Sequence, residues 1–441
     1  MIGKKVVFGV AAISLFCLVL GRGEKAGSKR AIALCGARLI TMSGPDYEDG
    51  ILLIRGGRIE AVGKDVLLPE GTERIDLKSC TVLPGFIDSF TNLGTVEVSS
   101  VSQDYDEAVA PLTPQLRIID SVNPANRFIG EARRSGITAV LCAPGDGNLL
   151  SGQSALLRLL GRTAESMVIK FPAGLHGTLG EAPKIRYGQK GIYPSTRMGE
   201  MALLRQTLLD ARQYAETLER HQMTKAPAKP KKPGEKSKEP SPSEPPARDF
   251  KLEALLPVLA REIPLVLAAD RMDDILSAVR LADEFGVRMI INHGAEAYKL
   301  GERLAGRNIP VLIGPLDDLG NRLEEQGYSW ENALRLHQAG VLFAFQTGSC
   351  HRSTTLLDQA GSAVSHGLPP REALKALTLY PARIFGLEAE IGSLEAGKSA
   401  DVIVFEGHPL ERSARVRMVI IAGVVVEDMR GPASSSIEER E

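Results

Sequence analysis

Three residues have side chains suited to metal chemistry, and they stand beside predicted strand ends or a polar loop. Asp270 and His293 follow apolar runs, and His176 precedes a Gly-Glu-Ala-Pro-Lys segment. Imidazole nitrogen and carboxylate oxygen are zinc ligands, and a catalytic zinc usually takes three ligands from the protein. The sequence therefore offers a mononuclear metal site made of His176, Asp270 and His293, with His351 as a further pocket candidate.

The same side chains also have structural interpretations, which stay open at this point. His293 is equally compatible with a hydrogen-bonded core histidine, and His351 with a loop residue. Asp270 has the type and place of a helix N-cap ahead of Asp273 and Asp274.

Metal-free nucleophiles are less well supported by the sequence. Cys350 lies beside His351, and a thiolate paired with imidazole is a nucleophile. Neighbours on an extended strand point to opposite sides, however, which argues against this pair. Ser151 and Ser154 flank Gly152 without the Gly-x-Ser-x-Gly elbow of serine hydrolases.

Strands that end at a common face would bring the metal-binding candidates together. Apolar runs alternate with helical patterns through the middle of the chain, which predicts a parallel sheet and, over about 300 residues, a closed (β/α)₈ barrel from 84 to 387. An open doubly wound sheet is the alternative. The predicted strands include Thr138–Leu141, Ile263–Ala268, Val287–Asn292, Ile309–Ile313 and Val341–Phe345, and the predicted helices Met198–His221 and Asp273–Gly286.

Both ends of the chain have the sequence pattern of antiparallel strands. Ile51–Arg55 and Arg58–Val62 are separated by two glycines, which is the signature of a tight hairpin. The segment 388–430 contains similar short apolar runs. Because an isolated hairpin is barely stable, we predict that 31–83 and 388–430 form one small β-sandwich domain.

Several stretches resemble the amidohydrolase superfamily, and most closely its imidazolonepropionase-like group. The stretch Val82–Gly94, a predicted strand followed by a polar loop, contains Pro-Gly-Phe-Ile-Asp, and Gly392–Asp401 is similar to the turn that returns the family's chain to its β-sandwich. Further similar stretches are Thr113–Arg117, Gly152-Gln153, Gly180–Lys184 and Pro194–Met198. The resemblance implies a metal-dependent hydrolase of C–N bonds other than peptide bonds, such as those of cyclic amides.

The resemblance also shows which metal ligands are replaced. Where the family has His-x-His after the first barrel strand this chain has Phe90 and Asn92, and where it has a fifth-strand histidine this chain has Ala268. Gly348 stands where the family has the aspartate that binds metal and acts as general base. His293 matches a family ligand, while His176 stands at a position that is often lysine.

Composition and the N-terminal segment lead to expectations about partners, location, disorder and cysteines. The net charge of -1 argues against nucleic acid as a partner. Lys4 and Lys5 precede an apolar run, so Met1–Gly23 is predicted to be an export signal, or an uncleaved anchor, of a periplasmic or extracellular protein. The Lys- and Pro-rich stretch 224–248 is predicted to be a disordered insertion. The cysteines beyond the signal segment are expected to be free thiols: Cys35, Cys80, Cys142 and Cys350.

One functional prediction follows from these observations. We expect an exported amidohydrolase-like protein with impaired catalysis. It would bind a small molecule in the pocket that corresponds to the family's active site, or pair with a copy of itself or with a relative that has all the catalytic residues. The alternative is an active hydrolase with one divalent metal ion, such as zinc, at His176, Asp270 and His293.

Overall fold

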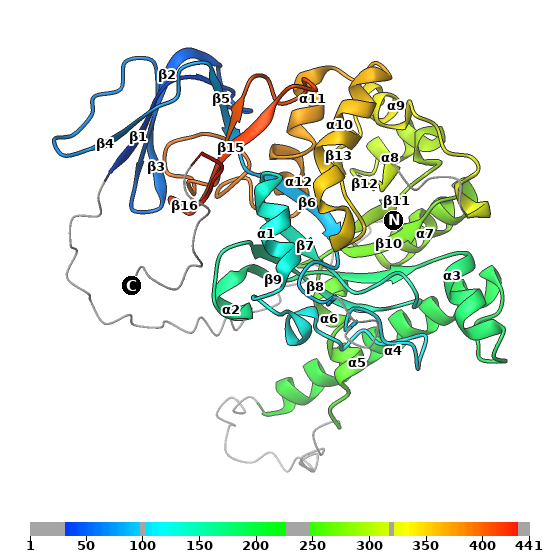
Figure 1. Ribbon diagram of the computed structural model, residues 1–441. Coiled ribbons are helices and arrows are strands. Elements are labelled where there is room, and N and C mark those ends of the chain that lie inside the picture. Colours follow the sequence, from blue (N-terminus) through cyan, green and yellow to red (C-terminus); the bar gives the residue numbers. More distant parts are fainter. Residues whose placement is uncertain (1–30, 98–102, 226–246, 317–321, 431–441) are drawn as a thin grey trace, which may run out of the picture.

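A computed structural model describes residues 31–97, 103–225, 247–316 and 322–430. The chain forms a strand-rich body from its two ends and a barrel from its middle, and Figure 1 shows the red C-terminal strands beside the blue N-terminal ones. The predicted fold class is therefore confirmed. In the described part of the chain, no helix is long and apolar enough to cross a membrane; Met1–Gly23 lies outside it.

The strand-rich body is one hydrogen-bonded sheet in the order β16-β15-β14-β5-β1-β2-β3, with β4 also paired to β1. Gly56 and Gly57 have φ angles of 61° and 82°, so the hairpin between β2 and β3 is the predicted one. The sheet encloses an apolar core that includes Leu34, Val82 and Val402. Its strands are β1 (Ile32–Leu39), β2 (Tyr47–Arg55), β3 (Arg58–Gly63), β4 (Glu73–Asp76), β5 (Cys80–Pro84), β14 (Val402–Glu406), β15 (Arg415–Ile421) and β16 (Val424–Asp428).

The barrel follows the order β6 to β13 without a break in the ladder. Its strands are parallel except β8, which runs antiparallel to both β7 and β9. The seam between β13 and β6 is closed by hydrogen bonds from Ser89 Oγ to Phe345 O (2.7 Å) and from Gly348 N to Phe90 O (3.0 Å). The strands are β6 (Phe86–Thr91), β7 (Ile137–Cys142), β8 (Gly152–Arg158), β9 (Val168–Thr178), β10 (Leu265–Ala269), β11 (Met289–His293), β12 (Val311–Ile313) and β13 (Phe343–Phe345).

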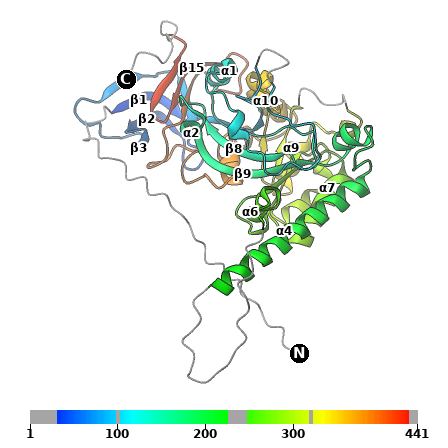
Figure 2. The ribbon, with the colours of Figure 1, turned by 90° about the horizontal axis from the view of Figure 1, so that it is seen from below.

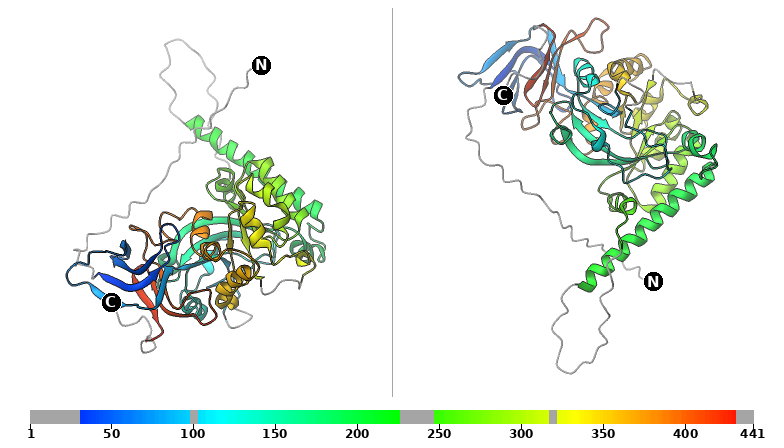
Figure 3. Two further views of the ribbon diagram at one scale, coloured as in Figure 1. Left: turned by 90° about the horizontal axis from the view of Figure 1, so that it is seen from above. Right: turned by 60° about the horizontal axis from the view of Figure 1, so that its bottom comes forward.

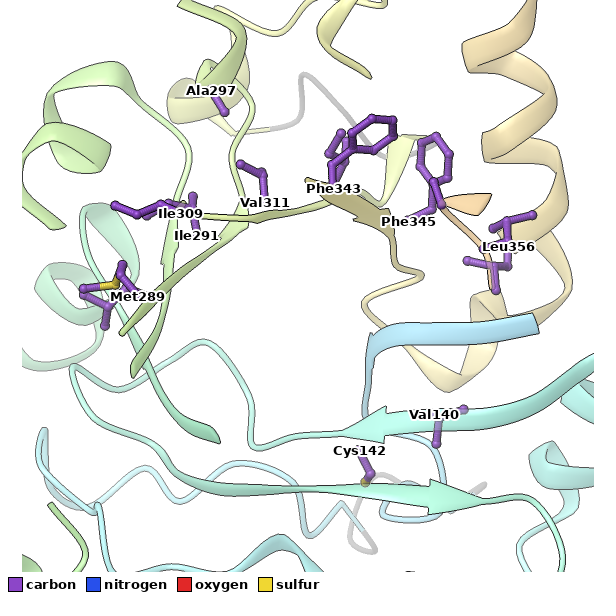
Figure 4. Close-up of a cluster of buried hydrophobic side chains, with 14 of the residues drawn as sticks. Val140, Cys142, Met289, Ile291, Ala297, Ile309, Val311, Phe343, Phe345 and Leu356 are labelled. Carbon is purple, nitrogen blue, oxygen red and sulfur yellow. The ribbon is translucent and has the colours of Figure 1, made fainter. Parts of the chain in front are cut away.

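Apolar side chains on the outer face of the barrel pack against the surrounding helices. Figure 4 shows part of this layer, with Phe343 and Phe345 of β13 near Leu356 of α10. The helices are α1 (Arg127–Arg134), α2 (Ala164–Met167), α3 (Glu181–Pro183), α4 (Arg197–Lys225), α5 (Phe250–Glu253), α6 (Leu256–Leu259), α7 (Met272–Phe285), α8 (Gly301–Ala305), α9 (Asn332–Gln338), α10 (Leu356–Ser365), α11 (Pro370–Lys375) and α12 (Leu379–Ile384).

The longest helix, α4, runs beside α7 along one flank of the barrel (Figure 2). Arg197 at its start forms an ion pair with Asp274 of α7 at 2.8 Å, and Arg205 one with Glu284 at 2.7 Å. Figure 3 shows that the far end of α4 projects away from the barrel, apart from the strand-rich body. The helix extends to Lys225, past the predicted start of the Lys- and Pro-rich insertion, and residues 226–246 lie outside the described part.

Candidate functional site

The carboxyl ends of the parallel barrel strands place the predicted site residues at one mouth. His176 lies near the end of β9, Asp270 directly follows β10 and His293 ends β11. In a barrel of this type the loops after the strands carry the chemistry. The prediction that these residues share one end of the barrel therefore agrees with their observed positions.

His293 is held by a residue that the sequence reasoning missed. Its Nε2 lies 2.9 Å from Oδ2 of Asp146, which belongs to the loop between β7 and β8. Burial lowers the pKa of His293, but the charge and hydrogen bond of Asp146, together with Asp270, outweigh burial and raise that pKa above its ordinary value. The sequence signal that could have revealed Asp146 is the Pro-Gly-Asp-Gly turn just after a predicted strand.

Asp270 is engaged by an arginine and a backbone amide. Its Oδ2 lies 3.2 Å from Nη2 of Arg322, and its Oδ1 accepts a hydrogen bond from Ala295 N at 3.3 Å. Arg322 also donates through Nε to Glu325 at 2.6 Å. The N-cap interpretation of Asp270 is wrong, because Arg271 occupies the N-cap position of α7 and its side chain makes no capping bond.

A small chamber separates these two charged groups. It has a volume of about 10 Å³ and is lined by Asp270, His293, Glu325 and Tyr328 among others. About that much volume is what one water molecule needs. The mouth therefore has no room between His293 and Asp270 for a ligand larger than water.

His176 is buried below this chamber, against an aromatic ring. Its ring centroid lies 5.6 Å from that of Phe90, which in turn lies 6.0 Å from the ring of His293. Burial lowers the pKa of His176 to about 4, so the imidazole is neutral at neutral pH. Its Nε2 has no hydrogen-bond partner in the described structure. Phe90, at a position where the resemblance implies an imidazole, thus lies next to both histidines.

The other positions at which the resemblance implies metal ligands belong to the scaffold. Asn92 Oδ1 accepts a hydrogen bond from Cys350 N at 2.8 Å, and Ala268 is buried. Gly348 has a φ of 70°, and a Cβ there would lie 3.4 Å from Gln346 Oε1. A side chain at position 348 is therefore disfavoured by both the backbone and the packing.

The side chains at the mouth do not fit the metal centre that the resemblance implies. Among the described residues, no group of three or more His, Cys, Asp or Glu side chains is arranged to hold a metal ion. The two possible metal ligands that line the chamber are both bound to other side chains. His293 is paired with Asp146, and Asp270 with Arg322. The guanidinium of Arg322 supplies the positive charge that a carboxylate at this place requires.

Buried polar atoms without partners line the barrel just inside the mouth. Ala268 pairs in register with Thr178 on one side and with Asn292 on the other. Thr178 Oγ1, Asn292 Nδ2 and Oε1 of Gln346, which follows β13, are buried and have no partner in the described structure. Buried polar groups are normally hydrogen-bonded, so these atoms point to bound water or another small polar molecule. The sequence reasoning did not identify Asn292 or Gln346 as site residues.

The metal-free nucleophiles considered from the sequence are not assembled. Burial raises the pKa of Cys350 to about 11, and the ring of His351 packs on Phe128 with centroids 4.7 Å apart. The hydroxyl of Ser154 donates to Gly174 O. All four described cysteines are free, as expected. The side chain of His351 therefore packs against Phe128 of α1 and does not line the chamber.

A wider groove crosses the rim above the chamber. It has a volume of about 620 Å³ and is formed by the loops after β7, β9 and β12. Gly147, Glu181, Arg186, Lys190, Arg322 and Glu324 are among its lining residues. Arg322 thus separates the groove from the chamber below, and the groove is large enough for a small-molecule ligand.

Comparison with known proteins points to one family. A sequence profile of the amidohydrolase family matches residues 274–426. Among solved structures, an amidohydrolase from Thermotoga maritima is 33% identical with a TM-score of 0.82, and the match covers 90% of this chain and 100% of that one.

Two curated proteins are similar over most of this chain. The amidohydrolase tasK of Hapsidospora irregularis is 24% identical over 401 residues, which are 86% of this chain but 40% of that relative, so the chain spans about two fifths of its length. The imidazolonepropionase of Pseudomonas paraeruginosa is 26% identical over 398 residues, covering 84% of this chain and 89% of that relative.

Proposed function

The chain belongs to the amidohydrolase family of hydrolases, in its imidazolonepropionase-like group, and from this premise we propose that its mouth binds a small polar molecule without metal-dependent hydrolysis. The observation that carries the proposal is the pairing of both charged site residues with protein groups. His293 is hydrogen-bonded to Asp146, and Asp270 to Arg322. A fold can keep its architecture while its site changes, because function resides in the site.

The lost general base adds a chemical argument. Amide hydrolysis needs an activated water, and a bound metal lowers the pKa of water from about 15.7 to about 7. No side chain at Gly348 can accept the proton of that water. His293 is the histidine that lines the chamber, and its Nε2 is hydrogen-bonded to Asp146.

The ligand would occupy the rim groove, with Arg322 as its polar anchor. The groove holds about 620 Å³, whereas the chamber below holds about 10 Å³. Side chains of both charges line the groove, including Lys190, Arg322 and Glu181. We therefore propose a small ligand that carries both hydrogen-bond donors and acceptors.

A mononuclear metal hydrolase remains the competing proposal. The unpartnered Nε2 of buried His176 favours it, because a neutral imidazole nitrogen without a hydrogen bond is an available ligand atom. That site would use His176, Asp270 and His293 and would require Asp270 and His293 to leave Arg322 and Asp146.

Hydrolysis of cyclic amides by the full chain distinguishes the two proposals. The rate is measured for the native chain and for His293→Ala, each with and without added Zn²⁺. We expect the same background rate in all four samples. A native rate at least tenfold above that of His293→Ala, and dependent on Zn²⁺, would contradict the metal-free proposal. The variant His351→Ala is the matched control, because His351 packs on Phe128 away from the chamber.

The location and the partners are also proposals. We propose export through Met1–Gly23, which lies outside the described residues, and association with a second copy or with a complete family member. Size-exclusion chromatography with light scattering measures the association directly, and a monomer at all concentrations would contradict self-association.

A further inference from the structure

A second large cavity lies at the opposite end of the barrel from the mouth. It has a volume of about 590 Å³ and is formed where β10, β11, β12 and β13 begin. Residues from the loops before these strands line it, among them Pro264, Val287, Pro310 and Leu342. The family's chemistry belongs to the other end of the strands, so this cavity is separate from the candidate site.

Positive charge dominates the lining of this cavity. Four arginines and one aspartate line it, a formal net charge of +3. Asp283 is already paired with Arg307 at 3.0 Å. The remaining three arginines, Arg261, Arg288 and Arg383, form no ion pair with a carboxylate among the described residues.

The hydrogen bonds that these three arginines make leave some of their N–H groups available to a ligand. Arg261 Nη1 donates to the carbonyl oxygen of Gly286 at 2.5 Å, and Arg288 Nη1 donates to that of Glu262 at 3.4 Å. The side chain of Arg383 makes no hydrogen bond with another described residue. A guanidinium carries five N–H donors, so each arginine keeps donors for a ligand.

A lysine also lies close to Arg288. Lys170 of β9 donates through Nζ to Phe385 O at 2.7 Å, beside the α12 end of the cavity. Burial and then the charge of Arg288 lower the pKa of Lys170, and only Glu388 opposes them. The cavity therefore gathers like charges that the described carboxylates balance only in part, an arrangement that favours the binding of an anion.

The rest of the lining is apolar. Val287, Ile309, Leu342 and Ile384 contribute to the wall between the arginines. Small-molecule sites commonly combine a mostly apolar wall with a few charged groups that fix orientation. Both the size and the lining of this cavity match that description.

We propose that this cavity binds an organic phosphate, with the phosphate on Arg288 and Arg383 and the organic part against the apolar wall. A phosphate monoester carries about -1.5 to -2 charges at neutral pH, whereas a carboxylate carries one, so phosphate better balances the net charge. The planar guanidinium fork also matches phosphate oxygens in bidentate geometry. The site would act as an effector or anchoring site, remote from the mouth.

Calorimetric titration of the full chain with phenyl phosphate tests the proposal. We expect saturable binding that weakens at least tenfold in R288Q/R383Q and is unchanged in R412Q. Arg412 is the matched control, because it is exposed and lies in the loop between β14 and β15, outside the cavity. We also expect inorganic phosphate to bind several-fold more weakly than phenyl phosphate, because it lacks the apolar part.

Three results would overturn the proposal. These are no saturable binding to the native chain, equal affinity of R288Q/R383Q and the native chain, and equal affinity for inorganic and phenyl phosphate. Should the double variant fail to fold, R383Q alone gives the same readout, because Arg383 has no partner among the described residues. Its expected loss is at least threefold.

Discussion

The two ends of the barrel differ in whether their ionisable side chains are paired with other protein groups. At the mouth, His293 and Asp270 are paired with Asp146 and Arg322 around a chamber of about 10 Å³. At the other end, a cavity of about 590 Å³ has three arginines that form no ion pair with a carboxylate of the described residues. At the mouth the ionisable side chains are thus paired with protein groups, while the opposite end presents arginines that the described carboxylates do not pair with. Charge that the protein itself does not neutralise is the better indicator of a ligand.

The largest expected effect concerns the pH dependence of stability at the mouth. Asp88 of β6 accepts hydrogen bonds from Thr347 N and Oγ1 across the seam, and burial raises its pKa to about 7. Between about pH 4 and pH 7 the folded chain holds a proton that the unfolded chain has released. The free energy of unfolding therefore falls as pH rises through this window, by about 4 kcal/mol from this group.

Denaturant unfolding at several pH values measures this slope. We expect Asp88→Asn to flatten it, while Asp65→Asn, at an exposed position in the strand-rich body, leaves it unchanged. An unaltered slope in Asp88→Asn would show that Asp88 is ionised in the folded chain. The arginines of the opposite cavity keep their protons throughout this range, so they contribute no such slope.

Removing one arginine from each end tests the comparison directly. R322A leaves buried Asp270 without its counter-charge and should lower the free energy of unfolding by about 2 kcal/mol, a value that allows for the partial exposure of Arg322. R383A removes a guanidinium that has no partner among the described residues, so its effect should stay within about 0.5 kcal/mol. Equal losses in the two variants would remove the distinction between the ends.

The sequence predicted the barrel well because its signals are local and repeated. The alternation of apolar runs and helical patterns, the Gly56-Gly57 hairpin and the Pro-Gly-Phe-Ile-Asp strand each report local structure. The antiparallel course of β8 was not predicted, since strand direction depends on its partners rather than on its own residues.

The site was predicted less completely, for a physical reason. The positions of Asp270 and His293 at strand ends followed from the strand pattern, and His176 was found through the family resemblance. Their partners did not, because Asp146 and Arg322 lie on loops 147 and 52 residues away from the groups that they bind. Contacts between distant loops leave no periodicity in a single sequence.

Placing a side chain at position 348 should be costly, and a comparison of two glycines shows why. Gly348 and Gly191 have φ angles of 70° and 71°, but an added Cβ meets Pro315 and Gln346 only at position 348. We expect G191A to cost about 1 kcal/mol from the backbone alone, and G348A about 1 to 2 kcal/mol. Chemical denaturation compares them, and a G348A loss no greater than that of G191A would show that the pocket still has room for a side chain there.

The smallest expected effect is a change in the titration of His293. Asp146→Asn removes the charge that raises the pKa of His293 while burial, which lowers it, remains. We therefore expect that pKa to fall, as followed by NMR of the imidazole resonances. An unchanged value would mean that Asp146 does not control His293.

The metal content of the full chain tests the central claim most directly. The protein is purified without chelator, and zinc, iron and manganese are measured by mass spectrometry together with protein concentration. The pairing of His293 with Asp146 and of Asp270 with Arg322 predicts far less than one metal ion per chain. About one tightly bound ion per chain, lost in His293→Ala, would contradict the account.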